Sequence, residues 1–303
     1  MKAKDIWLGT MKFNWIKLGV GLGFDLVALI LLIVFCAIGA VIGEFIGAYV
    51  AFLVWGFTVF KVYHVVSDYV SYMIKSAHIA CMAVAVQEGK IPENMVETGA
   101  QLVKERFVSS NVYIGVDKLV GGAVGQLQRT VGKIGGFLDF IPGMENAVEI
   151  LQKFIGIFLG YVDECCLGYT FVNKDQNAWK SACDGVCIYF QNVKTFLKEA
   201  VKITFIVMVF TTVVAIIAML LMLGLVGIFN VPSLGAVVLG IMVALTLKEA
   251  FVDSYIMCQM LTVFLQVAPQ TELSVDVYGK LCGLSSKFKE MWQNAGLQNQ
   301  DVA

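Results

Sequence analysis

The chain has 303 residues, 58% of them hydrophobic, and a mean hydropathy of +0.79. Its formal net charge is −1, so it has no excess of basic residues with which to attract nucleic acid. Together these properties argue against a water-soluble globular protein and against a nucleic-acid-binding one. We expect an integral membrane protein whose main partner is the lipid bilayer.

The first long apolar stretch covers residues 18–66, and its segment Leu26–Ile42 carries no charge. A membrane-spanning helix needs about 20 apolar residues, so this stretch is long enough to cross a bilayer twice. We expect a helical hairpin with a short tip at about Gly39–Gly47, where the only charged residue is Glu44.

Three glycines, Gly39, Gly43 and Gly47, are spaced four residues apart around this tip. On a helix this spacing makes a flat strip that lets another helix approach closely. The strip predicts helix packing within or between subunits. The alternative is that some of these glycines simply form the tip of the hairpin.

Asp25 follows Gly19, Gly21 and Gly23 and is expected about two turns inside the first span. A carboxylate inside a span is costly, which makes it a candidate functional residue. The alternative is a position near enough to the membrane surface for the carboxylate to remain in water.

Phe57, Phe60, His64 and Asp68 fall near one face of the second span and its extension. Aromatic rings attract cations, and a nearby carboxylate adds charge, so this set is a candidate site for an organic cation. Aromatic residues also gather at both surfaces of a membrane, and this belt is the alternative interpretation.

The middle of the chain, residues 93–198, is more polar. Apolar residues recur at helical spacing at Val116, Val120, Val124, Leu127, Val131 and Ile134, which predicts an amphipathic helix. A second apolar helix is expected over Asn146–Val162. Its Glu149 and Lys153 favour a helix that lies in the membrane interface or packs on the hairpins, and a re-entrant segment or a span is the alternative.

A second hairpin is expected over residues 203–247, which carry no charge, with a tip at about Gly227–Gly235. Beyond it, Phe251, Asp253 and Tyr255 lie where His64 and Asp68 lie after the first hairpin, and they complete the candidate cation site. The two chain ends therefore look like parallel repeats of one unit, an arrangement that transporters use. Chance similarity between two apolar hairpins is the alternative.

The lysines that flank both hairpins all lie on the side away from the tips. Because positive charge collects on the cytoplasmic side, both termini and the middle segment are predicted to be cytoplasmic in a multi-pass protein of the cell membrane. These lysines are Lys2, Lys4, Lys12, Lys17, Lys61, Lys75, Lys90, Lys194, Lys198, Lys202 and Lys248.

Eight cysteines are scattered along the chain, and none falls in an external loop of this topology. We expect reduced thiols and no disulfide framework. Cys183 and Cys187 share a helical face near Cys165 and Cys166, but the spacing matches no zinc module, so we expect no metal. The sequence also contains no catalytic signature and no cofactor motif, so we do not expect an enzyme.

The segment Ile150–Ala268 resembles the C-terminal half of the choline transporter-like membrane family. The matching features are ILQKFIGIF at 150–158, WKSACDG at 179–185, YFQN at 189–192, Val231-Pro232 at a tip, and AFVDSYIMC with FLQVA between 250 and 268. The resemblance implies uptake or exchange of choline-like cations. The chain departs from that family in having four clear spans instead of about ten, and in lacking its large external loop.

The sequence thus predicts an all-α polytopic membrane protein with two transmembrane hairpins and amphipathic cytoplasmic or interfacial helices. Its predicted parts are 1–92, a first hairpin repeat; 93–198, the amphipathic middle; and 199–303, a second repeat. We expect transport of a small solute, with a choline-like cation as the example, between the repeats. The rival hypothesis is an oligomeric channel or a non-transporting membrane scaffold, in which homo-oligomers form.

Overall fold

The computed structural model describes residues 1–106, 110–133, 160–229 and 233–296, and all its regular elements are helical within these ranges, which confirms the all-α prediction. The elements are α1 (Ala3–Gly9), α2 (Met11–Val66), η1 (Ser67–Ser71), α3 (Tyr72–Glu88), α4 (Met95–Arg106), α5 (Ser110–Lys133), α7 (Val162–Val172), α8 (Ala178–Gln191), α9 (Val193–Phe229), α10 (Ser233–Leu247), η3 (Lys248–Asp253), α11 (Ser254–Val267), η4 (Ala268–Gln270), α12 (Val275–Leu284) and α13 (Ser286–Asn294).

Two compact units form, and each takes segments from distant parts of the chain. Unit 1 consists of Met1–Thr10, Ser76–Ile206 and Tyr255–Ala303. Unit 2 consists of Met11–Lys75 and Val207–Ser254, and so holds both apolar stretches. The boundaries predicted at residues 92 and 198 separate two sequence repeats from the middle of the chain. Contacts between residues do not test such repeats, so these boundaries stay a prediction.

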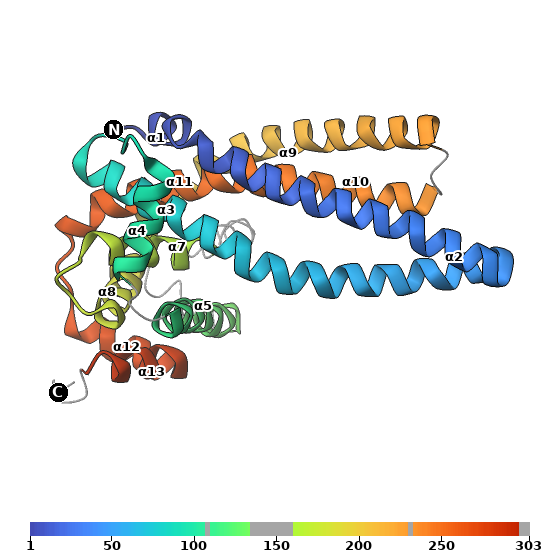
Figure 1. Cartoon of the computed structure of the whole chain (residues 1–303). Helices are drawn as coiled ribbons and strands as arrows, with labels where there is room; N and C mark the ends of the chain where they lie inside the picture. Colours follow the sequence, from blue (N-terminus) through green and yellow to red (C-terminus); the bar gives the residue numbers. More distant parts are fainter. Residues whose placement is uncertain (107–109, 134–159, 230–232, 297–303) are drawn as a thin grey trace. The chain divides into compact units, whose positions relative to one another are not determined.

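Helix α2 is a hairpin of two helical arms that meet at Gly43 and Glu44 (Figure 1). Gly43 has φ −144° and ψ 29°, and Glu44 has φ 48° and ψ −129°, so neither residue is helical. A positive φ is uncommon for a residue with a Cβ atom, so Glu44 marks the sharpest point of the bend. The bend lies within the predicted tip.

The two arms touch backbone to backbone just below the bend. A Cβ atom added to Gly39 would lie 2.3 Å from the carbonyl oxygen of Gly47, and one added to Gly47 would lie 2.1 Å from that of Gly39. Only glycine fits at both positions, because any other residue would push the arms apart. Gly43, in contrast, has open space around it and belongs to the bend.

The core of unit 2 joins both arms of α2 to α10. Trp55 on the second arm is 1% exposed and packs with Ala28 and Leu32 of the first arm and Leu239 of α10. Its indole Nε1–H donates a hydrogen bond of 2.8 Å to the carbonyl oxygen of Ala28. A buried indole needs such a partner, and this one fixes the register of the two arms.

Two stretches of the described residues are long and apolar enough to cross a membrane: Met11–Lys61 and Tyr69–Glu88. Core helices of soluble proteins pass the same test, and α3 fits that description because Ser76–Ala85 are all buried. Most apolar side chains near the bend of α2 are exposed instead. These data support membrane association in general terms.

Unit 1 is built around α8, in which every residue from Ser181 to Tyr189 is buried. Tyr189 stacks on Phe196 of α9 with ring centroids 4.5 Å apart, and Phe196 stacks on Phe264 of α11 at 5.8 Å. Stacked rings bury large apolar areas, so this trio ties α8, α9 and α11 into one core.

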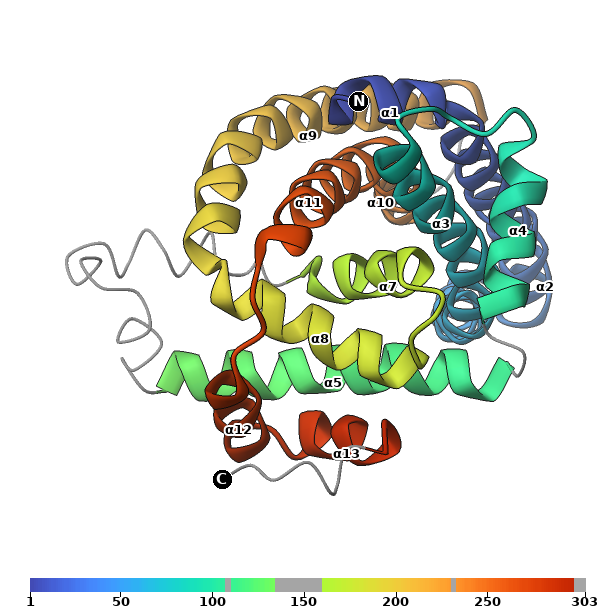
Figure 2. The ribbon, with the colours of Figure 1, turned by 90° about the vertical axis from the view of Figure 1, so that its left-hand side faces the viewer.

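The predicted amphipathic helix exists as α5, and its apolar face is covered within the chain. Val116, Val120, Val124 and Leu127 are each at most 4% exposed, and α5 lies between α8 and α13 (Figure 2). Gln126 links it to α13, since its Oε1 accepts hydrogen bonds from Ser285 Oγ at 2.8 Å and Lys287 N at 3.1 Å. These four side chains are thus not free to contact a membrane or another subunit, whereas the side chains of Val131 and Ile134 lie outside the described part of the structure.

Other sequence predictions lie partly or wholly outside the described residues. The helix predicted over Asn146–Val162 falls there except for its last three residues, of which Val162 starts α7. For the second tip, the structure describes α9 as far as Phe229 and α10 from Ser233. Figure 1 shows that α10 runs antiparallel to the last part of α9.

Candidate functional site

Asp25 lies on the first arm of α2, inside the apolar unit 2. Its side chain is 5% exposed, and Thr246 Oγ1 of α10 donates a hydrogen bond of 3.1 Å to its Oδ2. Its other oxygen, Oδ1, is buried without a hydrogen-bond partner among the described residues. A carboxylate with one donor in an apolar environment is strongly disfavoured, so this group needs a proton or a cation.

The contact between Asp25 and Thr246 depends on Gly21, one turn before Asp25. A Cβ atom added to Gly21 would lie 2.4 Å from Thr246 Cγ2, so a larger residue would displace Thr246. This glycine sets the distance between the two helices at the carboxylate. Its role was not evident from the sequence, where Gly19, Gly21 and Gly23 look equivalent.

A small cavity in unit 2 adjoins Thr246. Its volume is about 10 Å³, which is room for about one water molecule. Its lining includes Lys17 and Gly21 of α2, Ser71 of η1, Thr246, and Glu249 of η3. A water-sized cavity is therefore lined by the residue whose hydroxyl bonds Asp25.

Both η1 and η3 are π-helical turns, and each contributes to the lining of this cavity. Each follows a hairpin in the chain and precedes an α-helix, α3 or α11. A π-helical turn carries an extra residue and is frequent at functional sites. The predicted repeats pair residues 65–69 with residues 251–255, and these two stretches overlap η1 and η3 only in part.

Two lysines beside the π-helical turn η3 have polar partners within unit 2. Lys17 Nζ donates to Ser254 Oγ at 2.9 Å, and Lys248 Nζ lies 2.6 Å from Asp253 Oδ1. Asp253, predicted as part of a cation site, is thus neutralised by Lys248 in this conformation.

The predicted aromatic residues do not gather around Asp25 in unit 2. Phe57 and Phe60 are 67% and 66% exposed and are not in the cavity lining. The cation near Phe57 is Lys61, whose Nζ lies 5.6 Å from the ring centroid. Phe251 packs edge-on against Trp15 with centroids 5.6 Å apart.

Tyr255 belongs to unit 1, where its ring packs edge-on against Trp7 with centroids 5.5 Å apart. Its hydroxyl accepts a hydrogen bond of 2.9 Å from Gln259 Nε2. The side chains of His64 and Asp68 lie outside the described part of the structure. The proposed cation site therefore remains a prediction for these three residues.

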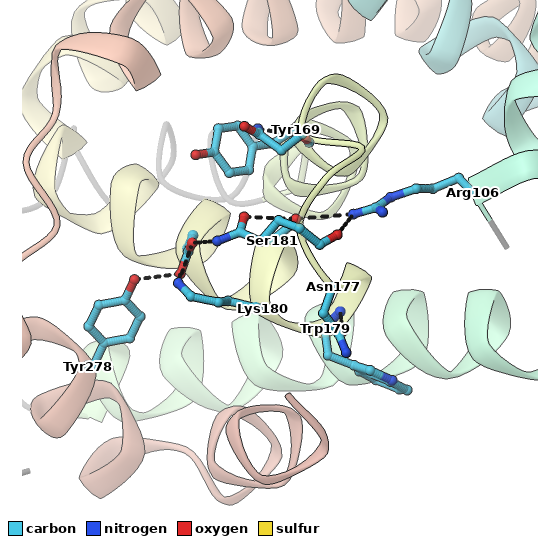
Figure 3. Close-up of polar contacts among 10 residues, drawn as sticks. Arg106, Tyr169, Asn177, Trp179, Lys180, Ser181 and Tyr278 are labelled. Carbon is cyan, nitrogen blue, oxygen red and sulfur yellow. Dashed lines mark hydrogen bonds and ion pairs between the residues drawn. The ribbon is translucent and has the colours of Figure 1, made fainter. Parts of the chain in front are cut away.

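Unit 1 holds a polar cluster that sequence reasoning missed, centred on Asp184 of α8 (Figure 3). The Asp184 residue is 1% exposed. Its Oδ1 accepts from Tyr278 of α12 at 2.6 Å, and its Oδ2 accepts from Gln176 at 2.7 Å and Lys180 at 2.9 Å. This buried carboxylate is fully bonded, in contrast to Asp25.

The Asp184 cluster fastens α12 to α8. Burial raises the pKa of Tyr278 far above that of a free phenol, and the neighbouring Asp184 adds to the shift, so the hydroxyl remains a donor. The spacing of Lys180 and Asp184 at i and i+4 was a signal in the sequence. Tyr278 gave none, because it lies 94 residues further along the chain.

Arg106 of α4 extends the cluster by holding the segment that precedes α8. Its Nη2 donates to Gln176 O at 2.6 Å and to Ser181 Oγ at 3.2 Å, and its Nη1 donates to Lys174 O at 3.1 Å (Figure 3). Guanidinium groups suit several carbonyl acceptors at once. The arrangement positions α8.

Four cysteines of α7 and α8 lie in the core of unit 1. Burial raises the pKa of Cys165, Cys166, Cys183 and Cys187 well above that of a free thiol, so they are neutral near pH 7. Neutral buried thiols are poor nucleophiles and poor metal ligands. Among the described residues, no group of three or more His, Cys, Asp and Glu side chains is placed to hold a metal ion.

No protein-family model, curated protein or solved structure matches this chain. The resemblance of Ile150–Ala268 to the choline transporter-like family therefore stays a prediction.

Proposed function

We propose that unit 2 is embedded in a lipid bilayer by its two apolar hairpins, and that the chain moves a small cationic solute across it with Asp25 as the central residue. The observation that carries the proposal is the buried Asp25, with one oxygen unpartnered among the described atoms, inside an apolar helical unit. Ionisable residues in such a position usually mark the path of a substrate or ion.

The surface of unit 2 supports a lipid environment. Val41, Phe45 and Leu223 are 88%, 84% and 62% exposed, and they belong to a long series of exposed apolar residues on α2, α9 and α10. Soluble monomers rarely expose apolar patches of this extent. Because α2 bends at Gly43 and Glu44, each of its arms can serve as a separate span of about 20 residues or more.

The second hairpin fits the same proposal. Helix α9 has 37 residues, and α10 adds 15 that continue into η3. Lys202 and Lys248 flank this hairpin, as Lys17 and Lys61 flank the first, all away from the tips. The positive-inside rule then places both termini and unit 1 in the cytoplasm and gives a multi-pass protein of the cell membrane.

The size of the cavity bears on the solute. Room for about one water molecule excludes a choline-like cation from this cavity in the conformation described here. A solute of that size would need the hairpins to separate, as in carriers that expose a central site alternately to each side. The resemblance to the choline transporter-like family keeps a choline-like cation as the first solute to test.

Flux into proteoliposomes tests the proposal. We expect uptake of at least one organic or inorganic cation by the wild-type chain, and loss of this uptake in Asp25→Asn. The matched control is Asp276→Asn, because the Asp276 side chain is 68% exposed and pairs with Lys280 on the surface of unit 1. Absence of flux for every cation tested, or equal flux in both variants, would contradict a transport role for Asp25.

An oligomeric channel or scaffold is the second candidate. Gly19 and Gly23 lie four residues apart on α2, are exposed, and have no atom within 4 Å of an added Cβ. Such a strip allows a helix of another copy to approach. The native mass of the detergent-solubilised chain separates the candidates, since a stable ring of several copies favours the channel or scaffold and a monomer favours the carrier.

A further inference from the structure

We propose that the ligand of Asp25 is a proton, exchanged with the cytoplasmic side of unit 2 through Thr246, a water molecule in the adjoining cavity, and Glu249. This inference rests on the proposed membrane embedding of unit 2 and names the ion that the site takes. It does not require that the transported solute is known.

A proton satisfies Asp25 with the groups that are present. Thr246 already bonds Oδ2, and a proton on the carboxyl group removes the charge that burial disfavours. A hard metal cation would need about six oxygen ligands. The described contacts of Asp25 supply only its own carboxylate and the Thr246 hydroxyl, which is too few.

The route from Asp25 to the cavity follows from the helix geometry. Thr246 bonds Asp25 and also lines the cavity, as does Glu249. Residues three apart on a helix share a face, so Thr246 and Glu249 line the same cavity. Ser71 of η1 and Lys17 complete the polar part of the lining.

The transfer balances as a relay of three groups. When Asp25 is deprotonated, the Thr246 hydroxyl hands its hydrogen to Oδ2 and takes one from the cavity water. The water is restored by the carboxylic acid of Glu249, which becomes a carboxylate. The reverse sequence returns the proton, and no covalent bond other than O–H is formed or broken.

Charged groups on every element packed against this part of unit 2 bear on the titration of Asp25. They are Lys17 on α2, Lys75 on α3, Lys248, Glu249 and Asp253 on η3, and Asp68 on η1, whose side chain lies outside the described part of the structure. Helix α10 carries no charged residue. Lys248 is neutralised by Asp253 at 2.6 Å, so Lys17 and Glu249 are the charged groups that the cavity itself presents.

Labelling with a carbodiimide tests the inference without any flux assay. Dicyclohexylcarbodiimide is lipid-soluble and reacts with protonated carboxyl groups in apolar surroundings. We expect mass spectrometry of the reconstituted chain to find it on Asp25, with a rate that falls about tenfold per pH unit above the midpoint. Sodium or potassium added at constant pH is expected to have no effect. Protection of Asp25 by either cation, or a rate independent of pH, would overturn the proton assignment.

Two substitutions at Thr246 test the relay. Thr246→Val removes the donor to Oδ2, so the midpoint of labelling is expected to rise by about one pH unit. Thr246→Ser keeps the hydroxyl and is expected to keep the midpoint. In Glu249→Gln we expect the same labelling midpoint and a slower response of a dye inside the vesicles to an external pH jump. Unchanged behaviour of both Thr246→Val and Glu249→Gln would remove this route.

A water-soluble carbodiimide distinguishes failure of the inference from failure of the proposed function. If it labels Asp25 as fast as the lipid-soluble reagent does, unit 2 is not in lipid and the proposed function fails. If only the lipid-soluble reagent labels Asp25, and sodium or potassium protects it, the membrane embedding stands and the proton assignment fails.

Discussion

The hydrogen bond between Tyr278 and Asp184 offers a quantitative test of how unit 1 is held together. In Tyr278→Phe the ring and its contact with Trp292, at 4.6 Å between centroids, are kept, and only the hydroxyl is lost. That hydroxyl donates at 2.6 Å to a carboxylate that is 1% exposed. Hydrogen bonds to charged groups contribute about 1.5–3 kcal/mol, so we expect a loss of that size in the free energy of unfolding.

A double-mutant cycle makes the test specific. Asp184→Ala removes the acceptor of Tyr278, Gln176 and Lys180 at once, so it is expected to cost more than Tyr278→Phe. In that background, Tyr278→Phe has no acceptor left to lose, so its cost should fall to about zero and the coupling energy should equal the single-mutant effect.

The assay is thermal unfolding in detergent, followed by circular dichroism. For a unit of this size, about 1 kcal/mol corresponds to about 2–4 °C in Tm, so Tyr278→Phe should lower Tm by about 3–12 °C. Tyr69→Phe is the control, because the Tyr69 ring is 65% exposed, and we expect a change within about 1 °C. A Tyr278→Phe effect no larger than the control, or additive costs in the cycle, would refute the reasoning.

Three further predictions concern the hairpin and the buried thiols. Gly47→Ala places a Cβ atom 2.1 Å from the carbonyl oxygen of Gly39 and should destabilise the α2 hairpin by about 1–3 kcal/mol. Gly19→Ala is the control, because an added Cβ atom meets open space there. Thermal unfolding of both variants checks this prediction. Trp55→Phe removes the 2.8 Å bond to a carbonyl oxygen and should cost about 1–3 kcal/mol in the same assay. Burial raises the pKa of Cys258 from 9.0 to about 12, so the thiol binds its proton more tightly in the folded chain than in the unfolded one. The free energy of unfolding should therefore be constant below pH 9 and fall between pH 9 and 12 by about 1.4 kcal/mol per pH unit. Denaturation at a series of pH values measures this slope, which should be smaller in Cys258→Ala.

The outcome at each of these sites would be informative in its own way. Equal stability of Gly47→Ala and Gly19→Ala would contradict the close approach of the two arms. A flat pH profile above pH 9 would contradict the deep burial of the thiols. A Trp55→Phe variant as stable as the wild type would mean that the indole bond does not fix the hairpin register.

Local patterns made part of the fold predictable from the sequence. An apolar stretch long enough for two spans, with glycines and a single charged residue at its centre, predicted a bend, and the structure bends at Gly43 and Glu44. Apolar residues at helical spacing predicted a helix at Val116–Ile134, and α5 runs from Ser110 to Lys133. These signals reside in neighbouring residues, which is why they were visible.

The contacts between distant residues were not predictable in the same way. The residues that complete the two carboxylate sites are far along the chain: Thr246 lies 221 residues from Asp25, and Tyr278 lies 94 from Asp184. No periodicity encodes such pairings. The sequence identified Asp25 as costly, but whether its second oxygen has a partner depends on how α2 and α10 pack. The covered face of α5 is a similar case, because amphipathicity does not say whether protein or lipid covers the apolar side.

The central claim is that lipid surrounds unit 2 and that the bend of α2 points away from the cytoplasm. An epitope tag inserted between Gly43 and Glu44 tests it most directly, since this bend has open space around it. We predict that an antibody added to intact cells binds the tag, and that the chain leaves the membrane fraction only with detergent. Binding that requires permeabilised cells, or a chain that stays in solution without detergent, would contradict the account.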